Sequence, residues 1–155
     1  MATMEGQLVV RDARFCILAA RFNDQIVEHL VRGAVDALVR HGATESAIDI
    51  LRVPGAFELP LAARRIAGTK KYDALVALGV VIRGATPHFD IVCNECAAGL
   101  SRVSADLGVP IGFGVLTCDT IDQALERAGA KQGNKGTDAA LAAVEMVNLL
   151  RQIGA

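Results

Sequence analysis

The chain has 155 residues, a length typical of one compact domain of about 100–200 residues, and we expect residues 1–155 to form a single domain. Its 52% hydrophobic and 21% charged residues exclude a disordered or low-complexity chain. The 16 basic and 17 acidic residues leave a formal net charge of −1, which offers no electrostatic footprint for nucleic acid or for an anionic membrane surface.

The sequence carries no sign of export or membrane insertion. Its first residues lack the basic and apolar regions of a secretory signal. The longest apolar stretch, Ala74–Ile82, is far shorter than the ~18–20 residues that a spanning helix needs. Four cysteines (Cys16, Cys93, Cys96 and Cys118) are too few for a disulfide scaffold and suit a reducing compartment. We therefore expect a cytoplasmic protein.

Short β-branched segments alternate with longer segments of helical period, a pattern that indicates a parallel sheet with helices. A short initial strand is predicted at residues 8–10, and core strands at 15–20, 48–53, 74–82 and 111–116. The predicted helices cover residues 24–41, 57–67, 88–107, 121–127 and 137–153, with a loop rich in glycine and lysine at 129–136. The third core strand is apolar throughout, which places it in the sheet centre. The last helix is apolar on nearly every side and is expected to be buried all round, partly by a neighbouring subunit.

Ligands of open α/β sheets bind beyond the carboxyl ends of the strands, where residues 21–23, 53–58 and 84–88 are expected to meet. A Gly84-Ala85-Thr86 turn that opens a helix offers backbone N–H groups and a hydroxyl to a phosphate; the alternative is an ordinary capped turn. His88 opens the same helix, and its imidazole could transfer protons near neutral pH. The alternative for His88 is a structural histidine.

Three other features allow two interpretations each. Phe22 could stack on a planar ring, or it could pack as a hydrophobic staple at a helix start. Cys93 and Cys96 have C-x-x-C spacing, but they lie inside a helix on its apolar face, which favours core packing over redox or metal chemistry. Residues 127–137 hold Arg127, Lys131 and Lys135 among glycines but do not match a nucleoside triphosphate loop, so they form either an anion site or a solvated turn.

Five segments in register resemble the 6,7-dimethyl-8-ribityllumazine synthase family. They are residues 21–23 (RFN), 53–60 (VPGAFELP), 79–90 (GVVIRGATPHFD), 113–117 (FGVLT) and 126–136 (ERAGAKQGNKG), and the match runs from about residue 14 to the carboxyl terminus. The resemblance implies a three-layer α/β/α fold, with a flavodoxin-like four-stranded parallel sheet, an extra N-terminal strand and an oligomeric assembly.

The resemblance also implies an activity. The family condenses 5-amino-6-(D-ribitylamino)uracil with 3,4-dihydroxy-2-butanone 4-phosphate to 6,7-dimethyl-8-ribityllumazine in riboflavin biosynthesis, releasing phosphate and water, and it uses no metal and no cofactor. His88 would be the catalytic proton-transfer residue. The phosphate would be held at Gly84, Ala85, Thr86 and Arg127. The remaining substrate-binding residues would be Phe22, Asn23, Ala56, Phe57, Glu58, Val80, Val81, Ile82, Phe113 and Lys135.

In the family the site lies between subunits, which implies that Phe113, Arg127 and Lys135 serve the site of an adjacent copy. The chain has more aliphatic residues than the core of one such domain should need, which agrees with a homo-oligomer. Family members form pentamers, pairs of pentamers or sixty-subunit shells, and the short spacing from Arg127 to Lys135 resembles the shell-forming members. The resemblance leaves open riboflavin synthase as a further partner, and it transfers no role to Cys93 or Cys96.

Two other functions stay open at this stage. A flavodoxin-like module could bind flavin or phosphate without catalysis, and it would bind FMN tightly and form no product. Riboflavin synthase of the same architecture would instead consume the lumazine; the intact segments at residues 21–23 and 84–88 favour the lumazine-forming enzyme.

Overall fold

The computed structural model describes residues 1–154 and contains the four predicted core strands. They are β1 (Phe15–Ala20), β2 (Ile48–Val53), β3 (Ala74–Ile82) and β4 (Ile111–Cys118), and they form one parallel sheet in the order β2-β1-β3-β4. The helices are α1 (Asp24–Arg40), α2 (Leu59–Gly68), α3 (His88–Leu107), α4 (Ile121–Glu126) and α5 (Lys135–Ile153), with single 3₁₀ turns at Glu45–Ala47 and Ala56–Glu58. The strand order is the flavodoxin-like one, so the predicted α/β architecture is confirmed.

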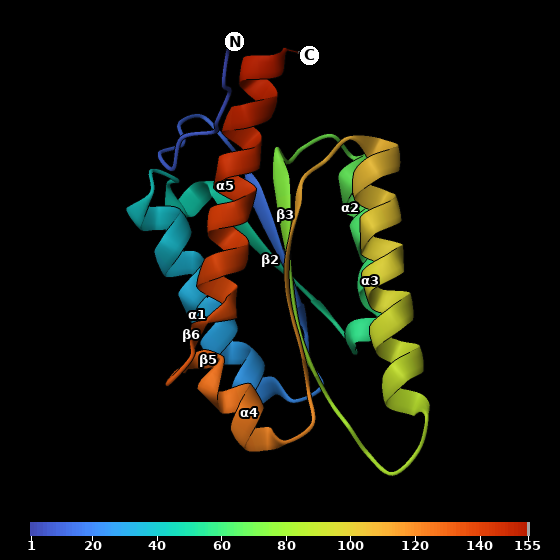
Figure 1. The fold of residues 1–155 in the computed structure, drawn as a ribbon. Coiled ribbons are helices and arrows are strands. Elements are labelled where there is room, and N and C mark those ends of the chain that lie inside the picture. The colour runs from blue at the N-terminus through green and yellow to red at the C-terminus, as the bar shows by residue number, and fades with distance from the viewer. Residues whose placement is uncertain (155) are drawn as a thin grey trace.

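The helices lie in two layers on opposite faces of the sheet (Figure 1). Alternate side chains of a strand point to opposite faces, and β1 shows this directly: Ile17 belongs to the core beneath α1 and α5. Its neighbours Cys16 and Leu18 belong to the core beneath α2 and α3. A sheet covered on both faces needs apolar residues at every position, which explains the continuous apolar runs of β1 and β3.

Strand β3 lies between β1 and β4, and its residues 74–81 are all buried. The prediction of a central third strand is therefore confirmed. The sheet edges are β2, whose Asp49 and Ile50 are exposed, and β4, which pairs only with β3 within the described residues. One side of β4 thus carries main-chain groups free of strand partners.

The predicted extra strand at residues 8–10 does not form in the described chain. This segment lies along α5 instead, where side chains of the helix supply its hydrogen-bond donors. Asn148 Nδ2 donates to the carbonyls of Gln7 (2.6 Å) and Val9 (2.9 Å), and the Arg151 guanidinium donates to those of Arg11 and Asp12. Both ends of the chain accordingly lie close together beside the last turns of α5 (Figure 1).

Helix α5 is buried on one face, so the prediction of burial all round is wrong for the single chain. Small residues, among them Ala140 and Ala143, press against the sheet and α1. The contact is close, since a Cβ on Gly136 would lie 2.1 Å from the Leu30 carbonyl oxygen. The opposite face leaves Met146 and Ile153 exposed. The prediction that a neighbouring subunit covers that face stays a prediction.

The predicted loop at 129–136 is shorter than expected. Strands β5 (Ala128–Ala130) and β6 (Gly133–Asn134) form a small antiparallel hairpin, and α5 begins directly after it. Asn134 caps the helix, because its side-chain oxygen accepts from the N–H groups of Gly136 (2.8 Å) and Thr137 (3.1 Å).

Within residues 1–154, no helix is both long and apolar enough to cross a membrane.

Candidate active site

A cavity of about 600 Å³ opens at the carboxyl ends of β1, β2 and β3. The chain leaves β1 toward one face of the sheet and β3 toward the other, so this is the point where ligands of open α/β sheets bind. We call it the first cavity. Its lining consists of Phe22, Asn23, Pro54, Gly55, Ala56, Phe57, Glu58, Val80, Val81, Ile82, His88, Ile91 and Val92.

Backbone and side-chain hydrogen bonds fix the rim of the first cavity. The N–H of Phe22 donates to the Pro54 carbonyl at 3.0 Å, which joins the ends of β1 and β2. Asn23 adopts a left-handed conformation with φ of 62°, which asparagine tolerates well. Its Nδ2 donates to the Val80 carbonyl at 2.9 Å. Asn23 therefore ties the β1 end to β3, and it makes no side-chain cap for α1.

Two aromatic rings project at the cavity. Phe22 is 73% exposed and Phe57 is 58% exposed, whereas the floor residues Val80 and Val81 are buried. Exposing two phenyl rings to water is unfavourable, and a planar ligand stacked on them would remove that cost. The staple interpretation of Phe22 does not fit its high exposure. Glu58 and His88 provide the ionisable groups of the lining.

Residues 84–87 connect β3 to α3 as an exposed loop, and His88 is the first residue of the helix. Gly84, Ala85 and Thr86 lie outside the first-cavity lining. Among the backbone hydrogen bonds outside helices and strands in residues 1–154, none involves residues 84–86. Their N–H groups are thus free of backbone acceptors at the start of a helix, where an anion is favoured.

A second cavity of about 400 Å³ lies on the far side of β4. Its lining includes Phe113, Gln123, Arg127 and Lys135, together with Gly114, Val115, Leu116, Thr117 and Cys118. Arg127 follows α4, and its Nη1 donates to the Gln123 carbonyl at 3.0 Å. The N–H of Lys135 donates to the Arg127 carbonyl at 2.8 Å. This bond places the backbones of the two basic residues side by side, and both residues line the cavity. Lys131, at the hairpin turn, lines neither cavity.

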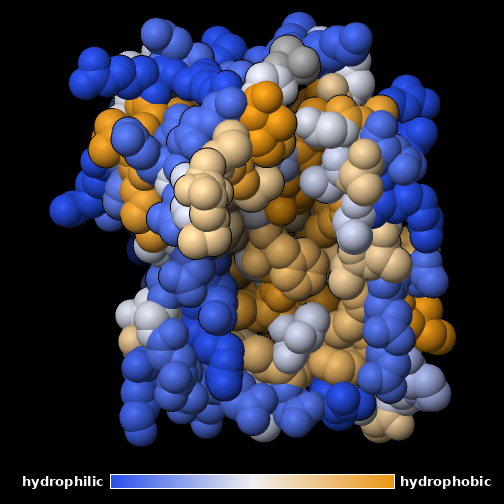
Figure 2. Space-filling model, turned by 45° about the horizontal axis from the view of Figure 1, so that its top comes forward, coloured by the Kyte–Doolittle hydropathy of each residue, from blue (hydrophilic) through white to orange (hydrophobic). Residues whose placement is uncertain are grey.

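The candidate residues thus fall into two groups. Those near the ends of β1, β2 and β3 line the first cavity, apart from residues 84–86 in the loop before His88, whereas Phe113, Arg127 and Lys135 line the second. Phe113 is 48% exposed although it lies within a strand. An apolar groove of about 500 Å³ adjoins it between α3 and β4, lined by residues such as Leu100 and Ile111. Apolar side chains gather in the middle of this face and are flanked by hydrophilic ones (Figure 2).

Sequence reasoning missed several residues that line the cavities. Ile91 lines the first cavity and is 58% exposed. It lies three residues after His88, so the two share one side of α3. In the sequence, Ile91 is an apolar residue outside the buried stripe of the helix. Hydrophobic periodicity alone predicts that such a residue lies on the surface. Gln123, in the second cavity, gave no signal because it belongs to no apolar pattern.

The interpretation of Cys93 and Cys96 as packing residues is confirmed. Cys96 is fully buried and belongs to the core beneath α3, while Cys93 packs against that core from a partly exposed position. Burial raises the pKa of Cys96 to about 11, mainly by desolvation, and it also raises the pKa of Cys93. In residues 1–154 no three His, Cys, Asp or Glu side chains gather in a way that could hold a metal ion.

Alkylation of the folded protein should therefore spare Cys16 and Cys96. Burial raises the pKa of both thiols to about 11, and the reactive thiolate is scarce at pH 8. Iodoacetamide labelling followed by peptide mass spectrometry measures this directly, with the urea-unfolded chain as the control. The unfolded chain loses these thiol protons near their ordinary pKa of 9.0, whereas the folded protein keeps them up to a pKa of about 11. The free energy of unfolding should therefore fall as pH rises through this range. Native labelling of Cys96 at the unfolded rate would contradict the buried assignment.

Comparison with known protein families gives one match that spans most of the chain. The model of the 6,7-dimethyl-8-ribityllumazine synthase family matches residues 12–151. This range contains every element from β1 to the last turns of α5 and the lining of both cavities. The chain belongs to the 6,7-dimethyl-8-ribityllumazine synthase family, a family of transferases in riboflavin biosynthesis.

Proposed function

We propose that this protein acts in the cytoplasm and condenses 5-amino-6-(D-ribitylamino)uracil with 3,4-dihydroxy-2-butanone 4-phosphate to 6,7-dimethyl-8-ribityllumazine, releasing phosphate and water. The observation that carries the proposal is the first cavity itself. It combines exposed aromatic rings, a carboxylate and an imidazole at the switch point of the sheet, in a chain of this family.

The first cavity suits the ribitylaminouracil. In the proposal the ring of Phe22 stacks on the pyrimidine, and main-chain groups of Val80, Val81 and Ile82 meet the polar edge of the ring. The ribityl chain, which is rich in hydroxyls, is held by Glu58 and by the backbone of Ala56 and Phe57. Main-chain and carboxylate groups satisfy the hydroxyls that burial removes from water.

The phosphate substrate belongs beside the 84–87 loop. The N–H groups at Gly84, Ala85 and Thr86 are free of backbone acceptors, and they precede the first turn of α3, where the helix dipole favours an anion. Arg127 supplies the charged clamp, since a guanidinium can bind two phosphate oxygens at once. Lys135 lies beside it in the second cavity and adds a second positive charge.

His88 is the proposed proton-transfer residue. The amine of the uracil attacks the ketone carbon, and the reaction then requires protons to leave nitrogen and to reach the departing oxygen. His88 lines the first cavity at the start of α3, between the proposed positions of the uracil and the phosphate. Acid–base assistance of this kind contributes roughly 10²–10⁴-fold. Holding both substrates in one pocket supplies a further large share of the rate.

The two groups of site residues favour a site shared between copies of the chain. The unpaired edge of β4, the apolar groove beside it and the half-exposed ring of Phe113 lie on one face. Contact through that face would cover the ring and bring Arg127 and Lys135 of one copy to the first cavity of another. We propose a homo-oligomer of this kind, with the short Arg127–Lys135 spacing pointing to a sixty-subunit shell. Light scattering after size-exclusion chromatography tests it, and a pentamer mass would refute the shell.

A single assay tests the activity. The purified protein is incubated with both substrates, and formation of the fluorescent lumazine is followed together with release of phosphate. We expect both signals in equal amounts. Tight FMN binding without product would instead indicate a flavin-binding module. Consumption of added lumazine with formation of riboflavin would indicate riboflavin synthase.

A further inference from the structure

Arg83 is the last residue before the proposed phosphate-binding loop, and it contacts two other parts of the chain. Its N–H donates to the Cys118 carbonyl at 2.9 Å, and its Nε donates to Asp119 Oδ1 at 2.8 Å. These partners are the last residue of β4 and the first residue of the turn that follows it. Its Nη1 lies 3.6 Å from Asp90 Oδ1 in the first turn of α3.

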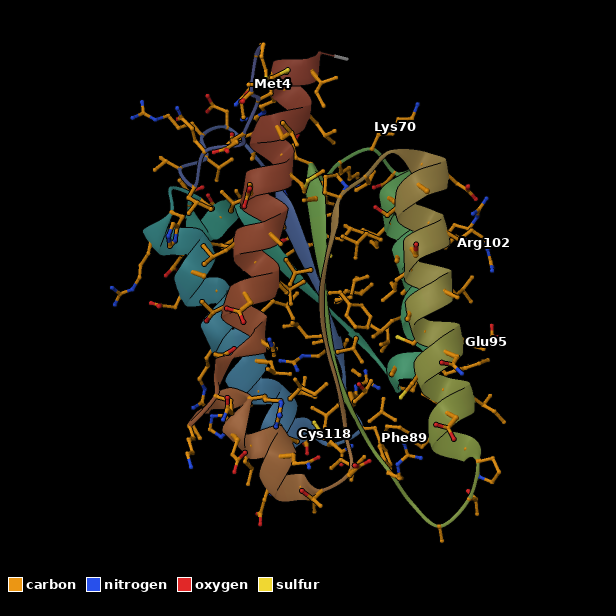
Figure 3. All side chains as sticks on the ribbon, in the orientation of Figure 1. Met4, Lys70, Phe89, Glu95, Arg102 and Cys118 are labelled. Carbon is orange, nitrogen blue, oxygen red and sulfur yellow. The ribbon has the colours of Figure 1, made fainter. Side chains whose placement is uncertain are left out.

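The guanidinium of Arg83 also lies over the ring of Phe89, with Cζ 4.3 Å from the ring centroid. Phe89 is anchored in the core beneath α3, so the ring is a fixed platform for the cation. Phe89 and Cys118 lie at the same end of the sheet (Figure 3). The backbone of Arg83 therefore leads into the 84–87 loop. Its side chain contacts the first turn of α3, which follows the other end of that loop.

Arg83 lines neither the first nor the second cavity. Its guanidinium is hydrogen-bonded to Asp119 and contacts Asp90 and Phe89, so its partners in the structure are groups of the protein itself. The loop itself has no backbone hydrogen bonds at residues 84–86, so its position depends on what holds its two ends.

The same contacts extend toward Arg127. The N–H of Asp119 donates to Gln123 Oε1 at 2.8 Å, and the Gln123 carbonyl accepts from Arg127 Nη1. The turn that anchors Arg83 is thus hydrogen-bonded to α4, the helix whose Gln123 carbonyl binds Arg127. A continuous set of contacts links the loop before His88 to the cation of the second cavity.

We infer that Arg83, anchored by Asp119, is a positioning residue that holds the 84–87 loop and His88 in place for the phosphate substrate. The inference rests on the proposed function and adds to it a residue that does not touch the substrate. A misplacement of about 1 Å in a reacting group can cost on the order of a hundredfold in rate. The ion pair is partly exposed, and such pairs contribute little to folding.

The test compares Arg83→Gln, Asp119→Ala and the double variant. Asp119→Ala is the cleaner cut, because the N-cap of α4 is Thr120, whose side chain accepts from the Gln123 N–H, and that cap remains. Each single change should lower kcat about ten- to hundredfold and weaken inhibition by inorganic phosphate. The double variant should lose no more than Arg83→Gln alone, because that change already removes the contact with Asp119.

The control is Arg64→Gln. This change breaks a different exposed ion pair, which joins Arg64 of α2 to Asp106 at the far end of α3. It should leave kcat and phosphate inhibition unchanged. Melting temperature and assembly state are measured for every variant, so that a loss of rate is not a loss of folded protein. A merely structural ion pair would shift melting and leave the phosphate inhibition constant where it was.

Three results would overturn the inference. If Asp119→Ala keeps full activity while Arg83→Gln does not, Asp119 is not the anchor of Arg83. If neither variant changes kcat, the loop needs no such anchor. If the two losses multiply, the residues act separately. Wild-type protein is assayed alongside, and its failure to form lumazine would refute the proposed function instead. Calorimetric binding of inorganic phosphate to wild type and variants tests the loop even without turnover.

Discussion

His88→Ala is expected to lower kcat by about 10²–10⁴-fold and to leave a slow enzyme rather than an inactive one. The imidazole transfers protons, whereas the pocket still holds both substrates, and positioning alone supplies much of the acceleration. His88 is exposed at the first turn of α3, so its removal should barely change stability. Steady-state kinetics with both substrates measures kcat and each KM separately.

The matched control for this variant is His29→Ala. His29 is exposed on α1 and lines neither cavity, and it is its backbone carbonyl that accepts a hydrogen bond from Asn134 Nδ2. That contact survives the substitution, so His29→Ala should keep the wild-type rate. An unchanged kcat for His88→Ala would remove His88 from the mechanism while leaving the proposed substrates standing.

Arg127→Ala is expected to raise KM for the phosphate substrate about hundredfold, with a smaller effect on kcat. A charge-assisted, bidentate contact to phosphate is among the strongest polar interactions in proteins, and truncating one partner of such a pair typically costs ~2–5 kcal/mol. Inorganic phosphate should also protect wild-type protein against thermal unfolding by mass action. That protection should vanish in Arg127→Ala and persist in Arg40→Ala, whose exposed guanidinium on α1 pairs with Asp36.

The same variant tests whether the site is shared. Chains carrying His88→Ala are co-assembled with chains carrying Arg127→Ala. If a site takes His88 from one copy and Arg127 from a neighbour, about one site in four regains both residues by chance pairing around a closed ring. Activity should then rise above that of either variant alone. Co-assembled oligomers without any recovery would show that each chain supplies both residues to its own site.

The first cavity was predictable because its residues follow the carboxyl ends of parallel strands. A strand end is a local feature, marked by the change from an apolar run to residues such as Asn23 or Pro54, and parallel strands bring such ends to one edge. The contact from Asn23 to the Val80 carbonyl could not be predicted, because it depends on which strand lies beside β1. Ile91 was not predicted for a similar reason, because an exposed apolar side chain indicates a ligand site only when the cavity that it lines is known.

The N-terminal segment shows the limit of a local pattern. Residues 8–10 have strand-like composition, yet a strand needs a partner with free backbone groups. In the described chain its carbonyls accept from α5 side chains such as Asn148, and no periodicity in either segment announces that pairing. Helix α5 is the converse case: its nearly uniform apolar sequence does not reveal that one face stays open.

The sequence by itself determined the alternation of strands and helices, the central place of Ala74–Ile82 and the chemistry gathered after the first three core strands. Each of these follows from side-chain periodicity and from where an apolar run stops, which are local properties. Only the tertiary structure decided that Phe113, Arg127 and Lys135 line a cavity of their own, and that Arg83 contacts both Asp119 and Asp90. Those relations depend on the order of the strands and on contacts between residues far apart in the chain, which local patterns do not encode.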